Sequence, residues 1–138
     1  MSEPRERPEQ LKRPERPERL TVLIGDDEPL IREVLSEVLA AEPDLDVVAT
    51  ASDADEAIQL AVRHTPVVAI LDVRMPGGGA WAAHEIRRLS PRTRVMAFSA
   101  YGDPGAVDEM RRVGVQEYLV KGLPNTDIVA AVRRVAAV

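Results

Sequence analysis

The sequence contains no cysteine and few aromatic or histidine residues. Its 138 residues include two His, one Trp, two Tyr and one Phe. The absence of cysteine excludes a disulfide scaffold, Cys-ligated zinc, an iron–sulfur cluster and thiol catalysis. Two histidines argue against a multi-histidine metal centre. A site made of oxygen ligands and charged side chains needs neither residue type.

Long apolar runs are also absent. No stretch approaches the roughly 18 to 20 apolar residues of a membrane span, and the amino terminus lacks the apolar segment of a signal peptide. We therefore expect a cytoplasmic protein without a membrane partner. The net charge of −5 argues against a purely electrostatic nucleic-acid binder. The length and the apolar fraction of 45% fit one globular domain with a single core.

The first 19 residues differ in composition from the rest of the chain. Arg, Pro and Glu repeat there, with very few large apolar side chains. Such a segment cannot bury enough surface to offset its chain entropy. We predict a disordered tail over residues 1–19 and a folded domain over residues 20–138. The alternative is that the tail is a docking arm for a partner.

From Leu20 onward, short apolar runs alternate with segments of helical periodicity. The expected strands are Leu20–Gly25, Val47–Thr50, Val67–Leu71, Arg94–Phe98 and Val115–Val120. Strict alternation with crossovers of a dozen or more residues predicts a parallel sheet with helices on both faces. We expect an α/β fold with a doubly wound five-stranded sheet, flavodoxin-like strand order 2-1-3-4-5 and five helices.

The sequence also predicts one feature of each of three helices. The helix expected over Pro29–Ala41 carries an apolar face made of Leu30, Ile31, Val34, Leu35, Val38 and Leu39. Asp53 and Glu56 form a capping box for the next helix. Asn125 or Thr126 is the expected N-cap of the last helix.

Polar side chains follow four of the five expected strands. Asp26 and Asp27 follow the first, Asp72 the third, Ser99 the fourth and Lys121 the fifth. Taken singly, an acid after a strand is commonly a helix cap, and a lone lysine is commonly solvated. Ligands of doubly wound sheets bind outside the carboxyl ends of the strands. Together, these residues therefore predict a binding site at that edge.

The residue types favour phosphoryl chemistry with a hard cation. Converging carboxylates repel one another unless a cation joins them, and oxygen ligands suit Mg²⁺. The Asp72 carboxylate can attack phosphorus to give an aspartyl phosphate. Mg²⁺ and Lys121 would then neutralise charge on the phosphoryl oxygens, and the Ser99 hydroxyl would donate a hydrogen bond to one of them.

The motifs around these residues resemble those of a known family. LIGDDEP, VVAILDVRMPG, MAFSA and EYLVKG occur in order and at family-like spacings. The segment from Leu20 to Val138 resembles the receiver domain of bacterial two-component response regulators. Gly122 after Lys121, with Pro124 shortly beyond, is more like the subfamily with a helix-turn-helix DNA-binding output domain.

The resemblance implies a role for each site residue. Asp72 accepts a phosphoryl group from a sensor histidine kinase or a small phosphodonor, and Ser99 and Lys121 bind that group. Tyr118 matches the aromatic switch position, although an aromatic residue in a strand is usually part of the core.

The resemblance also implies a metal cofactor. Mg²⁺ is held by Asp26, Asp27, Asp72 and the backbone carbonyl of Arg74. The domain is a signalling domain that catalyses only its own phosphotransfer and dephosphorylation. Phosphorylation shifts the face made of the fourth helix, fifth strand and fifth helix, which then controls an output domain or partner in transcription regulation. A homodimer on phosphorylation is possible, and DNA is reached only through an output domain absent from this chain.

The sequence departs from the family pattern at two places near the site. Ala80 stands where the family usually has glycine, and the neighbouring three glycines can supply the unusual backbone angles instead. Arg74 and Tyr101 form a bulky pair that, by the resemblance, lies at the mouth of the site and slows hydrolysis of the phosphoryl group.

Two other functions stay open. One is a receiver that binds its partner without phosphorylation. The other is an aspartyl-nucleophile phosphohydrolase, although those enzymes resemble a DxD pattern after the first strand, and this chain has adjacent Asp26 and Asp27.

Overall fold

The computed structural model describes residues 19–100 and 102–138. The tail predicted for residues 1–19 lies almost entirely outside the described residues, and so does Tyr101. The strands are β2 (Leu20–Gly25), β3 (Leu45–Ala51), β4 (Val68–Asp72), β5 (Arg94–Ser99) and β6 (Tyr118–Val120). The helices are α1 (Pro29–Ala40), α2 (Ala54–His64), α3 (Gly79–Leu89), α4 (Pro104–Arg112) and α5 (Asn125–Ala136).

The strands form one parallel sheet in the order β3-β2-β4-β5-β6. Numbered from the first strand, this is the predicted order 2-1-3-4-5, so the predicted fold is confirmed. The central strand β4 is buried at every position, because helices cover both faces of the sheet. This explains why its sequence is continuously apolar up to Asp72 instead of alternating.

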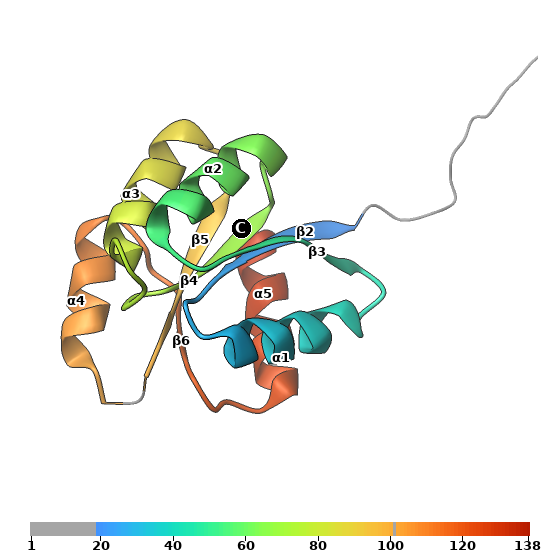
Figure 1. The fold of residues 1–138 in the computed structure, drawn as a ribbon. Coiled ribbons are helices and arrows are strands. Elements are labelled where there is room, and N and C mark those ends of the chain that lie inside the picture. Colours follow the sequence, from blue (N-terminus) through green and yellow to red (C-terminus); the bar gives the residue numbers. More distant parts are fainter. Residues whose placement is uncertain (1–18, 101) are drawn as a thin grey trace, which may run out of the picture.

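Each face of the sheet has its own core. Along β2, Val22 and Ile24 belong to the cluster under α1 and α5, whereas Leu23 belongs to the cluster under α2 and α3. Successive strand residues point to opposite faces, so one short strand serves both cores. Figure 1 shows α2 and α3 on one side of the sheet and α1 and α5 on the other.

The apolar face of α1 is wider than the surface that it buries. Leu35 and Leu39 are buried, but Leu30 is 67% exposed and Val34 is 48% exposed. At about 100° per residue, the six predicted apolar residues span roughly half of the helix circumference. The sheet covers only one side of this arc, which leaves Leu30 and Val34 in solvent.

The helix starts confirm one predicted cap and correct another. The Asp53 side chain accepts a hydrogen bond from the Glu56 amide at 2.8 Å, and the Glu56 carboxylate accepts one from the Ser52 amide at 2.7 Å. For α5, the prediction of an Asn125 or Thr126 cap is wrong. Pro124 is the N-cap, with φ −57° and ψ 147° and no side-chain bond, and Asn125 is already helical.

No helix within residues 19–100 and 102–138 is long and apolar enough to cross a membrane.

Candidate functional site

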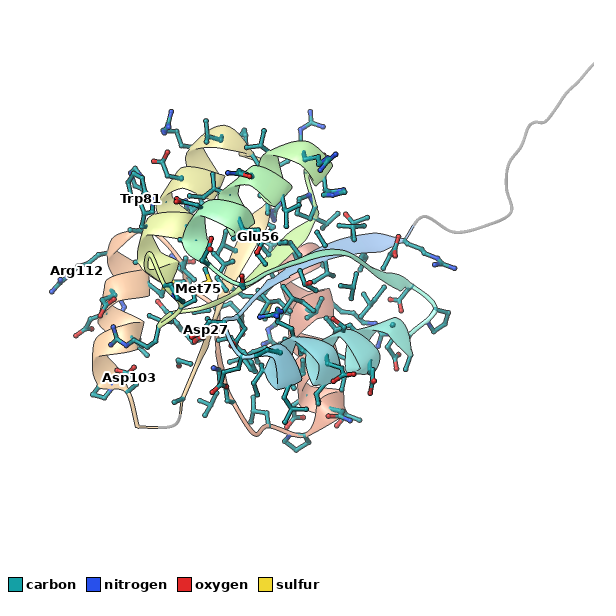
Figure 2. The ribbon with its side chains drawn as sticks, in the orientation of Figure 1. Asp27, Glu56, Met75, Trp81, Asp103 and Arg112 are labelled. Carbon is teal, nitrogen blue, oxygen red and sulfur yellow. The ribbon has the colours of Figure 1, made fainter. Side chains whose placement is uncertain are left out.

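The sheet order brings the predicted residues to one edge. Asp72 ends β4, and Asp26 follows β2 directly, next to it in the sheet. Ser99 ends β5 on the other side of β4, and Lys121 follows β6. Because all five strands are parallel, their carboxyl ends lie at the same edge, where Figure 2 also shows Asp27.

Lys121 lies between two buried carboxylates. Its Nζ is 3.0 Å from Asp26 Oδ2 and 3.4 Å from Asp72 Oδ1. The Asp26 side chain is fully buried and that of Asp72 is 5% exposed. The ammonium group also lies 5.5 Å from the centre of the Phe98 ring of β5, within the range of a cation–π contact.

Burial and repulsion shape the electrostatics of this edge. Burial raises the pKa of Asp72, the negative charge of Asp26 raises it further, and Lys121 only partly compensates. Burial alone would lower the pKa of Lys121, but its contacts with Asp26 and Asp72 outweigh that effect and raise it. One ammonium group therefore does not balance the carboxylates around it.

The unbalanced negative charge fits a hard divalent cation. Asp26 Oδ1 accepts a hydrogen bond from the Glu28 amide at 2.9 Å, whereas Asp26 Oδ2 is buried and accepts none from any described residue. The 3.0 Å approach of Lys121 Nζ to this oxygen is an ion-pair distance without hydrogen-bond angles. One oxygen each of Asp26, Asp27 and Asp72 lie within 4.8 Å of one another, and Asp27 is exposed. Such an oxygen cluster is typical of Mg²⁺ sites, and Asp27 leaves it open to solvent.

Glycines shape the loop that follows Asp72. Gly77 and Gly78 have φ of 87° and 90°, which explains how the loop turns although residue 80 is alanine. Gly79 is required for a different reason. A Cβ atom there would lie 2.4 Å from the Asp72 carbonyl oxygen and 2.7 Å from Val73 Cα. The first turn of α3 thus packs directly on the backbone of the candidate phosphoacceptor.

Contacts of Arg74 and Tyr118 near the site could not be predicted from the sequence motifs. The Arg74 side chain pairs with Asp103 and Glu109 of the α4 region, not with Asp26 or Asp72. Neither Asp103 nor Glu109 belongs to the motifs, although Asp103 followed by Pro104 is a helix-start signal that indicates the N-cap. The Tyr118 ring is half-buried, and its hydroxyl donates a hydrogen bond to the Val115 carbonyl.

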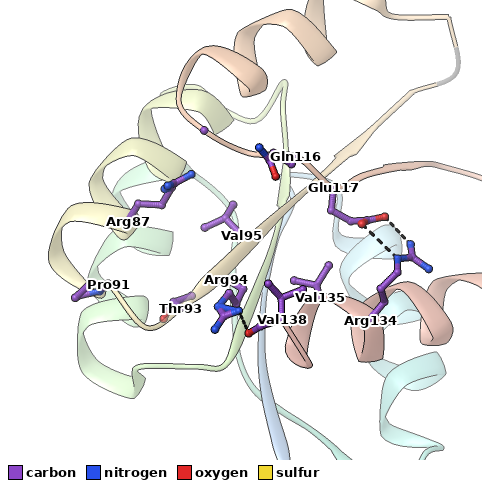
Figure 3. Close-up of a pocket in the computed structure, with 11 residues that line it drawn as sticks. Arg87, Pro91, Thr93, Arg94, Val95, Gln116, Glu117, Arg134, Val135 and Val138 are labelled. Atoms are coloured by element: carbon purple, nitrogen blue, oxygen red, sulfur yellow. Dashed lines mark hydrogen bonds and ion pairs between the residues drawn. The ribbon is translucent and has the colours of Figure 1, made fainter.

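A separate groove of about 620 Å³ lies at the amino ends of β5 and β6, on the opposite edge of the sheet (Figure 3). It contains the Glu117–Arg134 pair and a bond from Arg94 to the Val138 carbonyl. None of the predicted site residues lines it. The cluster of acids and lysine therefore does not lie in this groove but at the carboxyl edge of the sheet.

Comparison with known proteins agrees with this geometry. The model of the response regulator receiver domain family matches residues 22–133. The chain belongs to the response regulator receiver domain family. It is 39% identical over 117 residues to a probable transcriptional regulatory protein NarL of Mycobacterium tuberculosis, and the match covers 84% of this chain and 54% of that protein. It is 34% identical over 118 residues to the oxygen regulatory protein NreC of Staphylococcus haemolyticus, with the same coverage.

Solved structures place this receiver domain among similar folds. The signal receiver domain of a putative response regulator NarL from Mycobacterium tuberculosis superimposes with a TM-score of 0.83 at 38% identity, covering 88% of this chain and 98% of that one. A LuxR-family two-component response regulator from Aurantimonas superimposes with a TM-score of 0.79 at 28% identity, and the match covers 86% of each chain. The receiver domain described here spans about half the length of the curated relatives that it matches.

The close approach at Gly79 predicts a substitution with a large effect. Gly79→Ala forces its Cβ against the Asp72 and Val73 backbone. We expect a loss of about 2–3 kcal/mol in the free energy of unfolding, as for overpacked cores. Gly78→Ala is the matched control. It has open space but a φ of 90°, so its cost is about 1 kcal/mol. Urea denaturation measures both, and an equal loss in the two variants would contradict the packing argument.

The repulsion between Asp72 and Asp26 predicts that Asp72→Asn stabilises the metal-free protein. The pKa of Asp72 is raised in the native state, so the native state binds more protons than the unfolded state as Asp72 titrates. The stability of the wild type therefore falls as the pH rises from the ordinary range of aspartate through the raised native pKa. The advantage of Asp72→Asn should be absent at the acid end and reach a plateau above that window.

Urea denaturation in EDTA at a series of pH values measures this difference. Asp27→Asn, at an exposed carboxylate of the same edge, is the control and should change stability little. A variant Asp72→Asn that is less stable than the wild type at neutral pH would show that the carboxylate is not under the repulsion described above.

Proposed function

We propose that this receiver domain is switched by phosphorylation of Asp72, with a sensor histidine kinase or a small phosphodonor as the source. The observation that carries the proposal is the buried Asp72 carboxylate beside Lys121 and beside Asp26, whose Oδ2 is ion-paired with Lys121 but accepts no hydrogen bond from the described residues. An ammonium group aimed at an acid with excess negative charge nearby is suited to a site where negative phosphoryl oxygens are held by lysine and a cation. The domain acts as a signalling module, and its only chemistry is its own phosphotransfer and dephosphorylation.

In the proposed reaction, an oxygen of Asp72 attacks the phosphorus atom. An acyl phosphate O–P bond forms while the N–P bond of a phosphohistidine breaks, and the electron pair leaves with the imidazole, which takes up a proton. Lys121 favours the ionised form of Asp72 before the transfer and neutralises charge on the phosphoryl oxygens during it. Ser99, buried at the end of β5, donates its hydroxyl to one of those oxygens.

The proposed cofactor is Mg²⁺, held by Asp26, Asp27, Asp72 and the backbone carbonyl of Arg74. When bound, the ion supplies positive charge that offsets the charge of the phosphoryl oxygens. Asp26 would contribute Oδ2, which accepts no hydrogen bond from the described residues, and Asp27 would contribute a ligand on the solvent side.

The proposed output is the surface of α4, β6 and α5. Tyr118 belongs to it, and its ring packs against a cluster that includes Ala106 and Met110 of α4. We propose that Tyr118 changes position together with Ser99 when the phosphoryl group is bound, which shifts α4. The described part of this surface carries charged pairs such as Arg111–Asp108 and Arg134–Glu117. A homodimer formed through it would therefore be polar and sensitive to salt.

The relatives suggest the setting of this switch. One is named a probable transcriptional regulatory protein and another an oxygen regulatory protein, and each is about twice as long as the matched segment. We propose that this receiver works in the cytoplasm and controls transcription through a DNA-binding domain outside this chain.

The exposed apolar surface of α1 is the proposed contact surface for the phosphodonor protein. Leu30 and Val34 form this surface, and they are close in sequence to Asp27.

Phosphorylation by acetyl phosphate tests the proposal. With Mg²⁺, the wild type should gain the mass of one phosphoryl group, and Asp72→Asn should gain none. Lys121→Ala should be modified about 10²-fold more slowly, as when one transition-state donor is removed. Intact-mass spectrometry and the amount of acetate released measure both stoichiometry and turnover.

The outcomes separate the three candidate functions. An unmodified wild type would indicate a receiver that acts without phosphorylation. Rapid release of many phosphates per chain would indicate a phosphohydrolase. Equal modification of the wild type and Asp72→Asn would place the acceptor elsewhere. Each of these results contradicts the proposal.

A further inference from the structure

The Arg74 side chain connects the loop after Asp72 to helix α4. Its Nε donates to Asp103 Oδ2 at 2.9 Å, and its Nη2 donates to Asp103 Oδ1 at 3.0 Å. Its Nη1 donates to Glu109 Oε2 at 2.6 Å. The two bonds to Asp103 make a bidentate arginine–carboxylate pair, which fixes orientation as well as distance.

Both partners belong to the segment that starts at Ser99. Asp103 is the N-cap of α4, and its Oδ1 also accepts a hydrogen bond from the Ala106 amide at 3.2 Å. The guanidinium lies over the first helical turn, because a Cβ at Gly105 would be 3.5 Å from Arg74 Nη2. Arg74 therefore joins the loop that follows Asp72 to the start of α4, four residues after Ser99. Figure 2 shows Asp103 at the start of α4.

The charges make this contact specific but modest in energy. The bonds to Arg74 lower the pKa of Asp103, and the bonds to Asp103 and Glu109 raise the pKa of Arg74, so the contact favours the charged forms of Asp103 and Arg74. The Arg74 side chain is 51% exposed. Exposed pairs are worth little each, so the contact can bias an equilibrium several-fold without locking it.

We propose that Arg74, Asp103 and Glu109 form a clamp that holds α4 in the arrangement of Figure 1 and opposes its shift when Ser99 moves toward a bound phosphoryl group. This inference rests on the proposed function. A phosphoryl group that draws Ser99 toward Asp72 must also move Asp103, which lies only four residues further along the chain. The clamp is then a positioning device, and Arg74 does not itself act on the phosphoryl group.

The affinity of the protein for a phosphoryl mimic reports how strongly the clamp opposes the shift of α4. Binding and the α4 shift are linked, so a variant without the clamp should bind the mimic more tightly. We expect Arg74→Ala, Asp103→Asn and Glu109→Gln each to bind beryllofluoride about threefold to fivefold more tightly at saturating Mg²⁺, as the loss of an exposed ion-pair network allows. Asparagine is itself a good N-cap, so Asp103→Asn keeps the start of α4. Arg74→Ala keeps the backbone carbonyl proposed as a metal ligand.

The neighbouring acid provides a matched control. Asp108 pairs with Arg111 within α4 at 3.0 Å and does not reach the Asp72 loop. Asp108→Asn removes the same charge from the same helix and should leave the dissociation constant of beryllofluoride unchanged. Amide resonances of Ala106–Met110 in two-dimensional NMR report binding. Before any mimic is added, those of the three clamp variants should already be displaced toward their positions in the bound wild type.

The results distinguish the clamp from the function on which it rests. A wild type that does not bind beryllofluoride contradicts the proposed function. A wild type that binds, with clamp variants of unchanged affinity, overturns the clamp alone. If Arg74 instead contacts the phosphoryl group, Arg74→Ala binds more weakly while Glu109→Gln binds more tightly, and that pattern also overturns the clamp.

Discussion

The contact of Lys121 with two buried carboxylates is the interaction on which the rest of the site depends. Asp26 and Asp72 lie at the ends of neighbouring strands, where burial makes their negative charges costly. Lys121 lies 3.0 Å from one and 3.4 Å from the other, yet one Asp26 oxygen accepts no hydrogen bond from the described residues. An excess of negative charge held in this way is unfavourable alone and favourable once a cation is bound. We therefore propose that a metal and a phosphoryl group complete this site together.

The doubly wound sheet makes this arrangement possible with few residues. Three adjacent parallel strands supply Asp26, Asp72 and Ser99. Each residue lies at the end of its strand or directly after it, and this position alone brings it to the same edge as the other two. The same topology puts Ser99 at the end of β5 and Asp103 four residues later, at the start of α4. A change near Asp72 can therefore reach α4 both through Ser99 and through Arg74. We propose that these two connections link the site to the output surface.

Much of this could be predicted from the sequence because strong local patterns determine it. The apolar run before Asp72 indicates a central strand, and the alternation of strands and helices indicates the sheet. Side-chain contacts between distant segments could not be predicted in this way. The pairing of Arg74 with Asp103 and Glu109 depends on the side-chain rotamer of Arg74 and on where α4 packs, and neither has a sequence period. The exposure of Leu30 and Val34 likewise depends on how much of α1 the sheet covers. The α5 cap was mispredicted because Pro124 already has the extended backbone of an N-cap, so the helix begins one residue earlier than a polar cap would indicate.

We propose that Asp26 Oδ2, which accepts no hydrogen bond from the described residues, belongs to a divalent cation site shared with Asp72. A crystal structure of the protein at saturating Mg²⁺ tests this proposal. We predict an ion in contact with the Asp26 and Asp72 carboxylates and the Arg74 carbonyl, at about 2.0–2.1 Å from direct oxygen ligands and with several waters. An ion bound only at other carboxylates, with no contact to Asp26 Oδ2, would contradict it.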